Sequence, residues 1–263
     1  MGRAQWNKFN SWRAPSPKPE REKELNWRLD STTSNGLIAE VGIHHLDRAS
    51  LFFNARPTAA IGFGSLVLNK DGRDVPETIQ AMIEFPNQLQ FTYNATLGSS
   101  FDADYETYHG SFATIVCRED KAWMFKEAAA NLYGFEVYCR RDRFFRETGI
   151  ACIAGASKQD ALSAKPDDPV PLKRTAPYQS LENFLKNIAL LRDKIADFLP
   201  VAGVENVSEL EADDAVGLQE QIKKDVANRY SPAASAVDGF TATVTAIKIN
   251  EAIVKSQRLD FKD

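Results

Sequence analysis

The chain has 263 residues, which is enough for one large domain or two small ones around a buried core. Its hydrophobic fraction of 43% and charged fraction of 26% are ordinary for a globular protein, and a net charge of -4 argues against a nucleic-acid partner. No apolar run reaches membrane-spanning length and the first residues are too polar for a signal peptide, so we expect no membrane partner and, by default, a cytoplasmic location. Three widely spaced cysteines without a CxxC pair favour reduced thiols over disulfides or a zinc site.

Residues 1–35 hold three of the four tryptophans, Trp6, Trp12 and Trp27, among prolines and charges. A freely disordered arm should be poor in aromatic residues. The composition therefore predicts an extended segment that lies along a surface and inserts its rings into it. Two interpretations remain open: the rings are packing anchors, or some of them line a ligand cleft or a domain interface.

A helix is predicted to follow this arm. Spacings of three and four residues place its buried face on Ile43, Leu46, Ala49 and Phe53. Asn54 and Pro57 should end it, because proline cannot continue the hydrogen-bond ladder of a helix.

The middle of the chain is predicted to be rich in β-strands. Residues 58–68 read as a strand, and alternation over residues 78–85 and 89–97 around a PNQ turn predicts a hairpin. The buried side of its first strand should consist of Ile79, Ala81, Ile83 and Phe85. Residues 105–128 add short strands, and residues 135–145 are a candidate for another. Short strands in succession with tight turns favour an antiparallel sheet.

From about residue 155 the chain becomes a polar, proline-rich connection and then helical, over residues 178–191, 207–230 and 237–256. The middle helical segment is strongly charged, as expected of a solvated helix or hairpin added onto the core. In the last one, an apolar stripe is formed by Val237, Phe240, Val244 and Ile247. It is flanked by Ala242, Ala246, Ile249 and Ile253. The predicted fold class is α+β, a mostly antiparallel β-sheet with helices packed on one face.

The sequence offers no phosphate-binding loop. Its one GxG, at residues 62–64, lacks a third glycine and a following helix, which a dinucleotide fingerprint requires, so we interpret it as part of a strand. GxxxxGK[ST], GxSxG and HExxH are all missing from the sequence. No cofactor-binding residue is therefore predicted in this chain.

Glu40, His44, His45 and Asp47 form a dense titratable group near a helix start. In a helix Glu40 and His44 share a face, and a carboxylate beside an imidazole suits a general acid or base. A metal site is disfavoured, because adjacent helical histidines point about 100° apart and a third ligand is not evident. The alternative that remains open is two polar residues at the start of a helix.

The stretch GLIAEVGIHHLDRASLFFNARP, residues 36–57, resembles the signature of the Gfo/Idh/MocA oxidoreductases, the glucose–fructose oxidoreductase and inositol dehydrogenase family. The matching positions are Glu40, Gly42, His44 and Asp47, with Pro57 closing the helix. NWRLD, DGRDVPETIQAMIEFPN and GFTATVTAIKINEAI follow the pattern of a bacterial branch in the same order. The resemblance covers nearly the whole chain except residues 189–230, which look like a helical insertion.

The resemblance implies a C-terminal domain of this family, similar to that of glyceraldehyde-3-phosphate dehydrogenase, with the Rossmann domain absent. Residues 1–35 would be the arm leaving the missing nucleotide domain, and residues 36–263 the substrate and oligomerisation domain. NAD or NADP is the family's cofactor, and none is expected to bind this chain alone. The expected partners are a sugar or polyol substrate and further copies of the chain through the sheet, with a separately encoded Rossmann domain as a candidate. The chain would be a truncated gene, a fragment or a split protein.

By the same resemblance, His44 would transfer the proton of a substrate hydroxyl and Glu40 would contact or orient the substrate. His45 would pack or line the edge of the pocket. The remaining expected substrate-binding residues lie on the arm: Trp6, Asn10, Trp12, Arg13, Trp27 and Arg28. The rival hypotheses are a non-catalytic carbohydrate-binding or oligomerisation module and a gene remnant.

Overall fold

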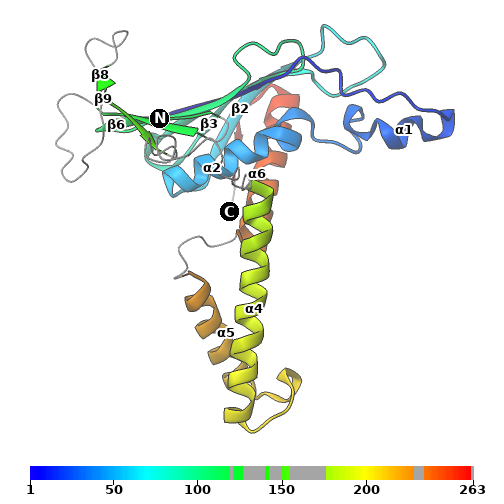
Figure 1. Cartoon of the computed structure of the whole chain (residues 1–263). Helices are drawn as coiled ribbons and strands as arrows, with labels where there is room; N and C mark the ends of the chain where they lie inside the picture. The colour runs from blue at the N-terminus through cyan, green and yellow to red at the C-terminus, as the bar shows by residue number, and fades with distance from the viewer. Residues whose placement is uncertain (119–120, 127–139, 142–149, 155–175, 228–233, 262–263) are drawn as a thin grey trace, which may run out of the picture. The chain divides into compact units, whose positions relative to one another are not determined.

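The computed structural model describes residues 1–118, 121–126, 140–141, 150–154, 176–227 and 234–261. The chain divides into two units, one of residues 1–164 and 237–263 and the other of residues 165–236. The first unit contains a β-sheet covered by helices, and the second consists of helices (Figure 1).

The sheet has ten strands in the order β10-β2-β3-β4-β1-β5-β6-β7-β9-β8. Their bounds are β1 (Gly2–Asn7), β2 (Ala59–Ser65), β3 (Thr78–Glu84), β4 (Gln90–Thr96), β5 (Asp104–His109), β6 (Ala113–Arg118), β7 (Lys121–Lys126), β8 (Arg140–Arg141), β9 (Ile150–Ala154) and β10 (Leu259–Asp260). Neighbouring strands pair antiparallel except β1 and β4, which are parallel. The predicted fold class is confirmed. Most of the candidate strand at residues 135–145 lies outside the described residues.

The helices of the first unit are short except two. They are η1 (Pro19–Arg21), α1 (Glu22–Leu25), η2 (Trp27–Leu29), the π-helix η3 (Ile38–Gly42), α2 (Ile43–Phe53), η4 (Pro86–Gln88) and α6 (Ala236–Lys255). Figure 1 shows α2 and α6 on the same side of the sheet. Within the described residues, no helix combines the length and apolarity needed to cross a bilayer.

The second unit contains α4 (Ala176–Ala202), η5 (Val207–Glu209) and α5 (Ala212–Ala227). The two long helices pack together and are joined by an ion pair between Lys194 Nζ and Asp225 Oδ2 at 2.8 Å. Helices were predicted in both places, although α4 continues further than the sequence pattern indicated.

The first residues of the chain form β1, an interior strand between β4 and β5. The sequence predicted only an extended arm here. Gly2 and Ala4 face the core, and a Cβ on Gly2 would lie 2.9 Å from the Phe91 ring, so only a residue without a side chain fits. Because small residues carry little hydrophobic periodicity, the pattern could not distinguish this strand from a loop.

The core lies between the sheet and the helices that cover it. The predicted inward face of β3 is confirmed, since Ile79, Ala81, Ile83 and the following Phe85 are all buried. From the helices, the core receives Leu46, Ala49, Ala246, Ile249, Ala252 and Ile253.

The buried face of α6 differs from the stripe the sequence favoured. Ala246, Ile249 and Ile253, expected only to flank the contact, are buried, whereas Ile247 is 43% exposed. Both faces of α6 are apolar, so periodicity alone could not decide which one the sheet covers.

Gly62 lies in β2 directly beneath α6, and not in a nucleotide-binding loop. A Cβ there would be 2.6 Å from Cγ1 of Ile253 and 2.7 Å from the carbonyl oxygen of Gln80. The predicted strand is confirmed, and its glycine is required by the close approach of the helix.

Candidate functional site

The titratable group of the sequence lies where a π-helix, η3, leads into α2. The predicted end of the helix is confirmed, because Asn54 caps α2 in the left-handed conformation with φ 48°. The π-helix was not predicted; such turns occur often at functional sites. Its last residue is Gly42, where a Cβ would lie 3.0 Å from Cε1 of Tyr93, so the close packing of this turn favours glycine.

The two adjacent histidines differ completely in their surroundings. His44 is exposed on the first turn of α2. His45 is only 2% exposed, and its Nε2 lies 2.9 Å from Oδ1 of Asp104 on β5. Burial alone would raise the pKa of Asp104, but the contact with His45 outweighs it and lowers that pKa. His45 is thus held by the scaffold, while His44 is available to a ligand.

A second contact joins the same helix and strand. The buried carboxylate of Glu106 accepts a hydrogen bond from the Tyr108 hydroxyl at 2.5 Å and pairs with the guanidinium of Arg48. Together with His45 and Asp104, this network fixes the rotation of α2 over β5. Sequence reasoning missed it because the partners lie about sixty positions apart.

Glu40 contacts Arg28, a residue of the arm. Its Oε2 accepts a hydrogen bond from Nε of Arg28 at 3.0 Å, and its Oε1 lies 3.4 Å from Oγ of Ser34. In the described part of the chain, no hydrogen bond or ion pair joins Glu40 to His44, although the sequence placed them on one helix face.

Arg28 also lies against two of the predicted tryptophans. Its guanidinium carbon is 5.7 Å from the ring centre of Trp12 and 4.9 Å from that of Trp27. Trp12 in turn lies 6.2 Å from Trp6, ring centre to ring centre. Trp6 and Trp12 pack against the core, while Trp27 is exposed. The structure therefore brings Trp6, Trp12, Trp27, Arg28 and Glu40 into one contiguous group.

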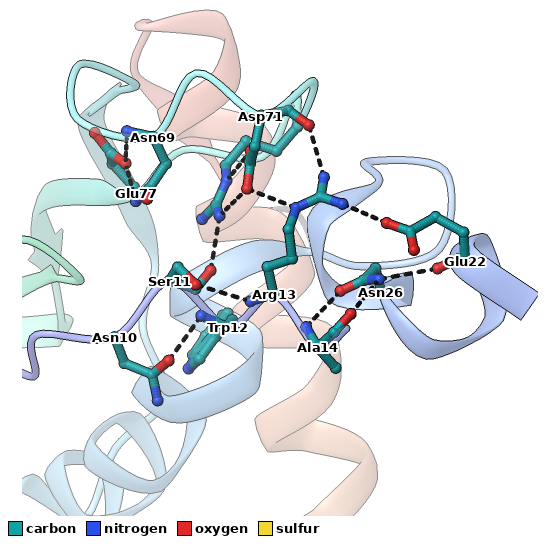
Figure 2. Close-up of polar contacts among 11 residues, drawn as sticks. Asn10, Ser11, Trp12, Arg13, Ala14, Glu22, Asn26, Asn69, Asp71 and Glu77 are labelled. Carbon is teal, nitrogen blue, oxygen red and sulfur yellow. Dashed lines mark hydrogen bonds and ion pairs between the residues drawn. The ribbon is translucent and has the colours of Figure 1, made fainter. Parts of the chain in front are cut away.

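Arg13 is engaged elsewhere, on the loop that precedes β3 (Figure 2). It donates to Oδ2 of Asp71 at 2.9 Å and to the Asp71 carbonyl oxygen at 2.6 Å, and it pairs with Glu22. Arg73, whose side chain is 1% exposed, donates to Asp71 at 2.6 Å and to the Ser11 carbonyl at 2.7 Å. Hydrogen bonds from Arg73 and Arg13 hold the pKa of Asp71 well below its usual range.

Two asparagines fix the turns of the arm. Oδ1 of Asn10 accepts a hydrogen bond from the Trp12 backbone at 2.8 Å. The buried Asn26 side chain accepts from the Ala14 backbone N–H at 2.8 Å and donates to its carbonyl at 3.0 Å, as Figure 2 shows. Asn10 and Arg13 thus determine the conformation of the arm next to Trp12.

Glu77 is a buried carboxylate that the sequence did not single out. It is buried and accepts hydrogen bonds from the backbone N–H groups of Val67, Leu68 and Asn69. Burial alone would raise its pKa, but these donors lower it. Glu77 therefore organises the loop after β2 and has no free oxygen to offer a ligand.

Among the residues that the structure describes, no group of three or more histidine, cysteine, aspartate or glutamate side chains could hold a metal ion. A surface depression lies between the arm and the loop before β3, lined in part by Arg13, Asn26, Arg73 and Asp74. Neither His44 nor the tryptophans line it.

Comparison with known proteins gives a family match over part of the chain. The sequence profile of the GFO/IDH/MocA C-terminal domain matches residues 7–118. A search of curated protein sequences gives no match.

Solved structures resemble the chain over nearly its whole length. Levoglucosan dehydrogenase in complex with NADH and L-sorbose gives a TM-score of 0.54 at 13% identity, covering 98% of this chain and 57% of that one. An NAD binding oxidoreductase from Klebsiella pneumoniae gives 0.53 at 11% identity, covering 100% and 58%. The super-repressor mutant of Gal80p from Saccharomyces cerevisiae gives 0.51 at 8% identity, covering 98% and 57%.

At these identities the structural likeness shows the fold, and the chain spans little more than half the length of the proteins it matches. The family profile covers the arm from residue 7 onward, α2, and the strands from β2 to β6. The family model thus matches residues 7–118, and the chain has the fold of the C-terminal part of Gfo/Idh/MocA oxidoreductases.

Proposed function

We propose that this chain is the substrate-binding and proton-transfer part of an NAD(P)-dependent oxidoreductase that acts on a CH–OH group of a sugar or polyol. The observation that carries the proposal is the group around Arg28. Arg28 lies against Trp12 and Trp27 and binds Glu40, which precedes the exposed His44 by four residues. Aromatic rings next to hydrogen-bonding side chains are typical of sites that bind hydroxylated ligands.

The nicotinamide nucleotide would bind to a domain outside this chain. The one GxG of the chain is closed off in β2, where Ile253 and the Gln80 carbonyl occupy the space around Gly62, so it does not fit a pyrophosphate. The hydride acceptor would belong to a Rossmann domain. This chain would bind the substrate, and the His44 imidazole would take up the proton of the reacting hydroxyl.

Two features support His44 as the proton-transfer group. It is exposed, so a ligand can reach it. The His45–Asp104 contact and the Arg48–Glu106 ion pair hold the helix that carries it. A positioned imidazole contributes a factor of about 10² or more to such a reaction.

Calorimetric titration of the isolated chain with NAD(H) and NADP(H) tests where the nucleotide binds. We expect no heat of binding, because the chain encodes no phosphate-binding loop. Binding with a micromolar Kd would contradict the proposed division of labour.

Reconstitution with a Rossmann-domain partner tests the role of His44. Once turnover is restored, His44→Ala should lower kcat by a factor of about 10² or more. His109→Ala is the matched control, since His109 is exposed at the end of β5, and it should leave kcat unchanged. An unchanged rate for His44→Ala would remove this residue from the mechanism.

A second candidate function is a non-catalytic assembly module. The sheet face turned away from α2 and α6 exposes Phe63 at 62% and Met82 at 46%, next to Ile61. Apolar side chains gathered on an uncovered face mark an interaction site. The likeness to a super-repressor mutant shows that this fold also occurs in a protein described as something other than an oxidoreductase. We propose that further copies of the chain bind through this face.

A further inference from the structure

The guanidinium of Arg28 is held in place by its neighbours, but only one of its nitrogen atoms donates a hydrogen bond to a described residue. Its Nε donates to Glu40, and its plane is flanked by Trp12 and Trp27. Among the described residues, no group accepts a hydrogen bond from its two terminal amino groups, Nη1 and Nη2. The side chain is 50% exposed, so these amino groups are open to a ligand.

The contrast with Arg13 shows what this arrangement leaves available. Arg13 uses Nε, Nη1 and Nη2 for Asp71 and Glu22, so each nitrogen of its guanidinium already has a partner. Arg28 keeps the edge that can form two parallel hydrogen bonds with a carboxylate or a phosphate. Because the Trp rings and Glu40 already hold its plane, little further conformational entropy is lost when an anion binds.

We infer that Arg28 recognises an anionic group on the substrate, so that the ligand of this site is a monosaccharide bearing a carboxylate or a phosphate. The inference rests on the proposed function, whose substrate class it narrows. Trp12 contacts both Arg28 and Trp6, so one sugar ring held near the Trp6–Trp12 pair lies beside the guanidinium.

Among the residues that the structure describes, Glu40 is the one acidic residue that binds Arg28, and it does so through Nε alone. One of its oxygens binds Nε of Arg28 and the other lies 3.4 Å from Oγ of Ser34, and neither forms a hydrogen bond with Nη1 or Nη2 of Arg28 in the described part of the chain. Glu40 therefore orients the guanidinium and neutralises part of its charge. Because the net positive charge is reduced, an anion is recognised mainly through the geometry of its hydrogen bonds with Arg28.

Titration of the full 263-residue chain, labelled with ¹⁵N at tryptophan, tests this inference by NMR. The ligands are D-glucose, D-glucuronate and D-glucose 6-phosphate at matched ionic strength, with acetate as an anion without a sugar. We expect the indole N–H signals of Trp12 and Trp27 to shift, and at least one charged sugar to bind about tenfold more tightly than glucose. Which charged sugar binds more tightly identifies the carboxylate or the phosphate.

Variants assign the preference to Arg28. Arg28→Gln should reduce it to within about twofold, and Arg28→Lys, which keeps the charge but not the planar fork, should retain only part of it. Arg21→Gln is the matched control, because Arg21 is an exposed arginine paired with Glu24, and it should leave the preference intact.

Three results would overturn the inference. If glucose binds as tightly as both charged sugars, the anion site is wrong while the proposed sugar site stands. If Arg28→Gln still binds the charged sugar more tightly than glucose, a residue other than Arg28 binds the anionic group. If no sugar shifts the Trp12 or Trp27 signals, the inference and the proposed substrate site are both wrong.

Discussion

Asp71 joins two arginines that are sixty residues apart in the sequence. It accepts hydrogen bonds from Arg13 on the arm and from the buried Arg73 beside it, and Arg73 also binds the Ser11 carbonyl. These contacts fasten residues 11–13 to the loop before β3 and thereby place Trp12. One carboxylate thus holds residues 11–13 of the arm against the loop before β3.

Replacing Asp71 by asparagine should destabilise the protein. The buried guanidinium of Arg73 would lose its charge partner, which costs about 1–3 kcal/mol in the free energy of unfolding. Urea unfolding at pH 7 measures this. Glu24→Gln, which removes an exposed ion pair with Arg21, is the control and should leave the urea midpoint unchanged.

The carboxylate of Asp71 should also make the free energy of unfolding depend on pH in the acidic range. The pKa of Asp71 in the folded protein lies below the ordinary value of 3.8, so its contribution is present above that value and is lost as the pH falls further. The difference in unfolding free energy between the native chain and Asp71→Asn should therefore be smaller at pH 3 than at pH 7. An equal difference at both pH values would contradict this assignment.

Two elements meet most closely where α6 crosses β2. Gly62 provides the space for Ile253, and the strand hydrogen-bonds its neighbour β3 beneath the helix. The π-helix before α2 is the other element that depends on a glycine, because Gly42 lies against the Tyr93 ring. In both places the contact between elements, and not the local propensity, determines the residue.

Gly62→Ala should weaken the packing of α6 on the sheet. The added methyl group would overlap Ile253 and the Gln80 carbonyl, and the shift needed to fit it costs about 1–3 kcal/mol. Chemical denaturation followed by circular dichroism measures the loss.

Gly217→Ala is the matched control for this substitution. Gly217 lies within α5, and a Cβ there meets no atom within 4 Å. Alanine should therefore stabilise α5 by up to about 1 kcal/mol, through its higher helix propensity. A loss of stability in this variant equal to that of Gly62→Ala would refute the packing explanation.

For the whole molecule, the open face of the sheet is the feature that bears on assembly. Ile61 and Met82 lie opposite each other on β2 and β3, and Phe63 is two residues further along β2. The opposite face of these strands is covered by the core. A sheet with one apolar face uncovered is suited to packing against a second sheet.

We expect the chain to be an oligomer in solution and Phe63→Lys to dissociate it, because a charge would be buried at the interface. Light scattering coupled to size exclusion measures the mass. Leu51→Lys is the control, because Leu51 is exposed on α2, outside the sheet. A native chain that is monomeric would contradict the proposed assembly.

Much of the fold could be predicted from local patterns. Alternation defined the β3–β4 hairpin, spacings of three and four defined α2, and Asn54 marked its end. The resemblance of residues 36–57 to the family signature also pointed to the family whose model matches residues 7–118. These features depend on residues close together in the chain, so sequence patterns contain them.

The rest was decided by contacts between distant residues. Only the tertiary structure places β1 inside the sheet, buries His45 against Asp104 and joins Glu40 to Arg28 instead of His44. The physical reason is that a hydrogen bond or a close backbone approach between distant segments leaves no periodicity in the sequence. The sequence by itself determined most of the helices and strands, the resemblance to the family, and the choice of His44 and His45 as candidate residues. The tertiary structure decided which histidine faces outward and which arginine remains open to a ligand.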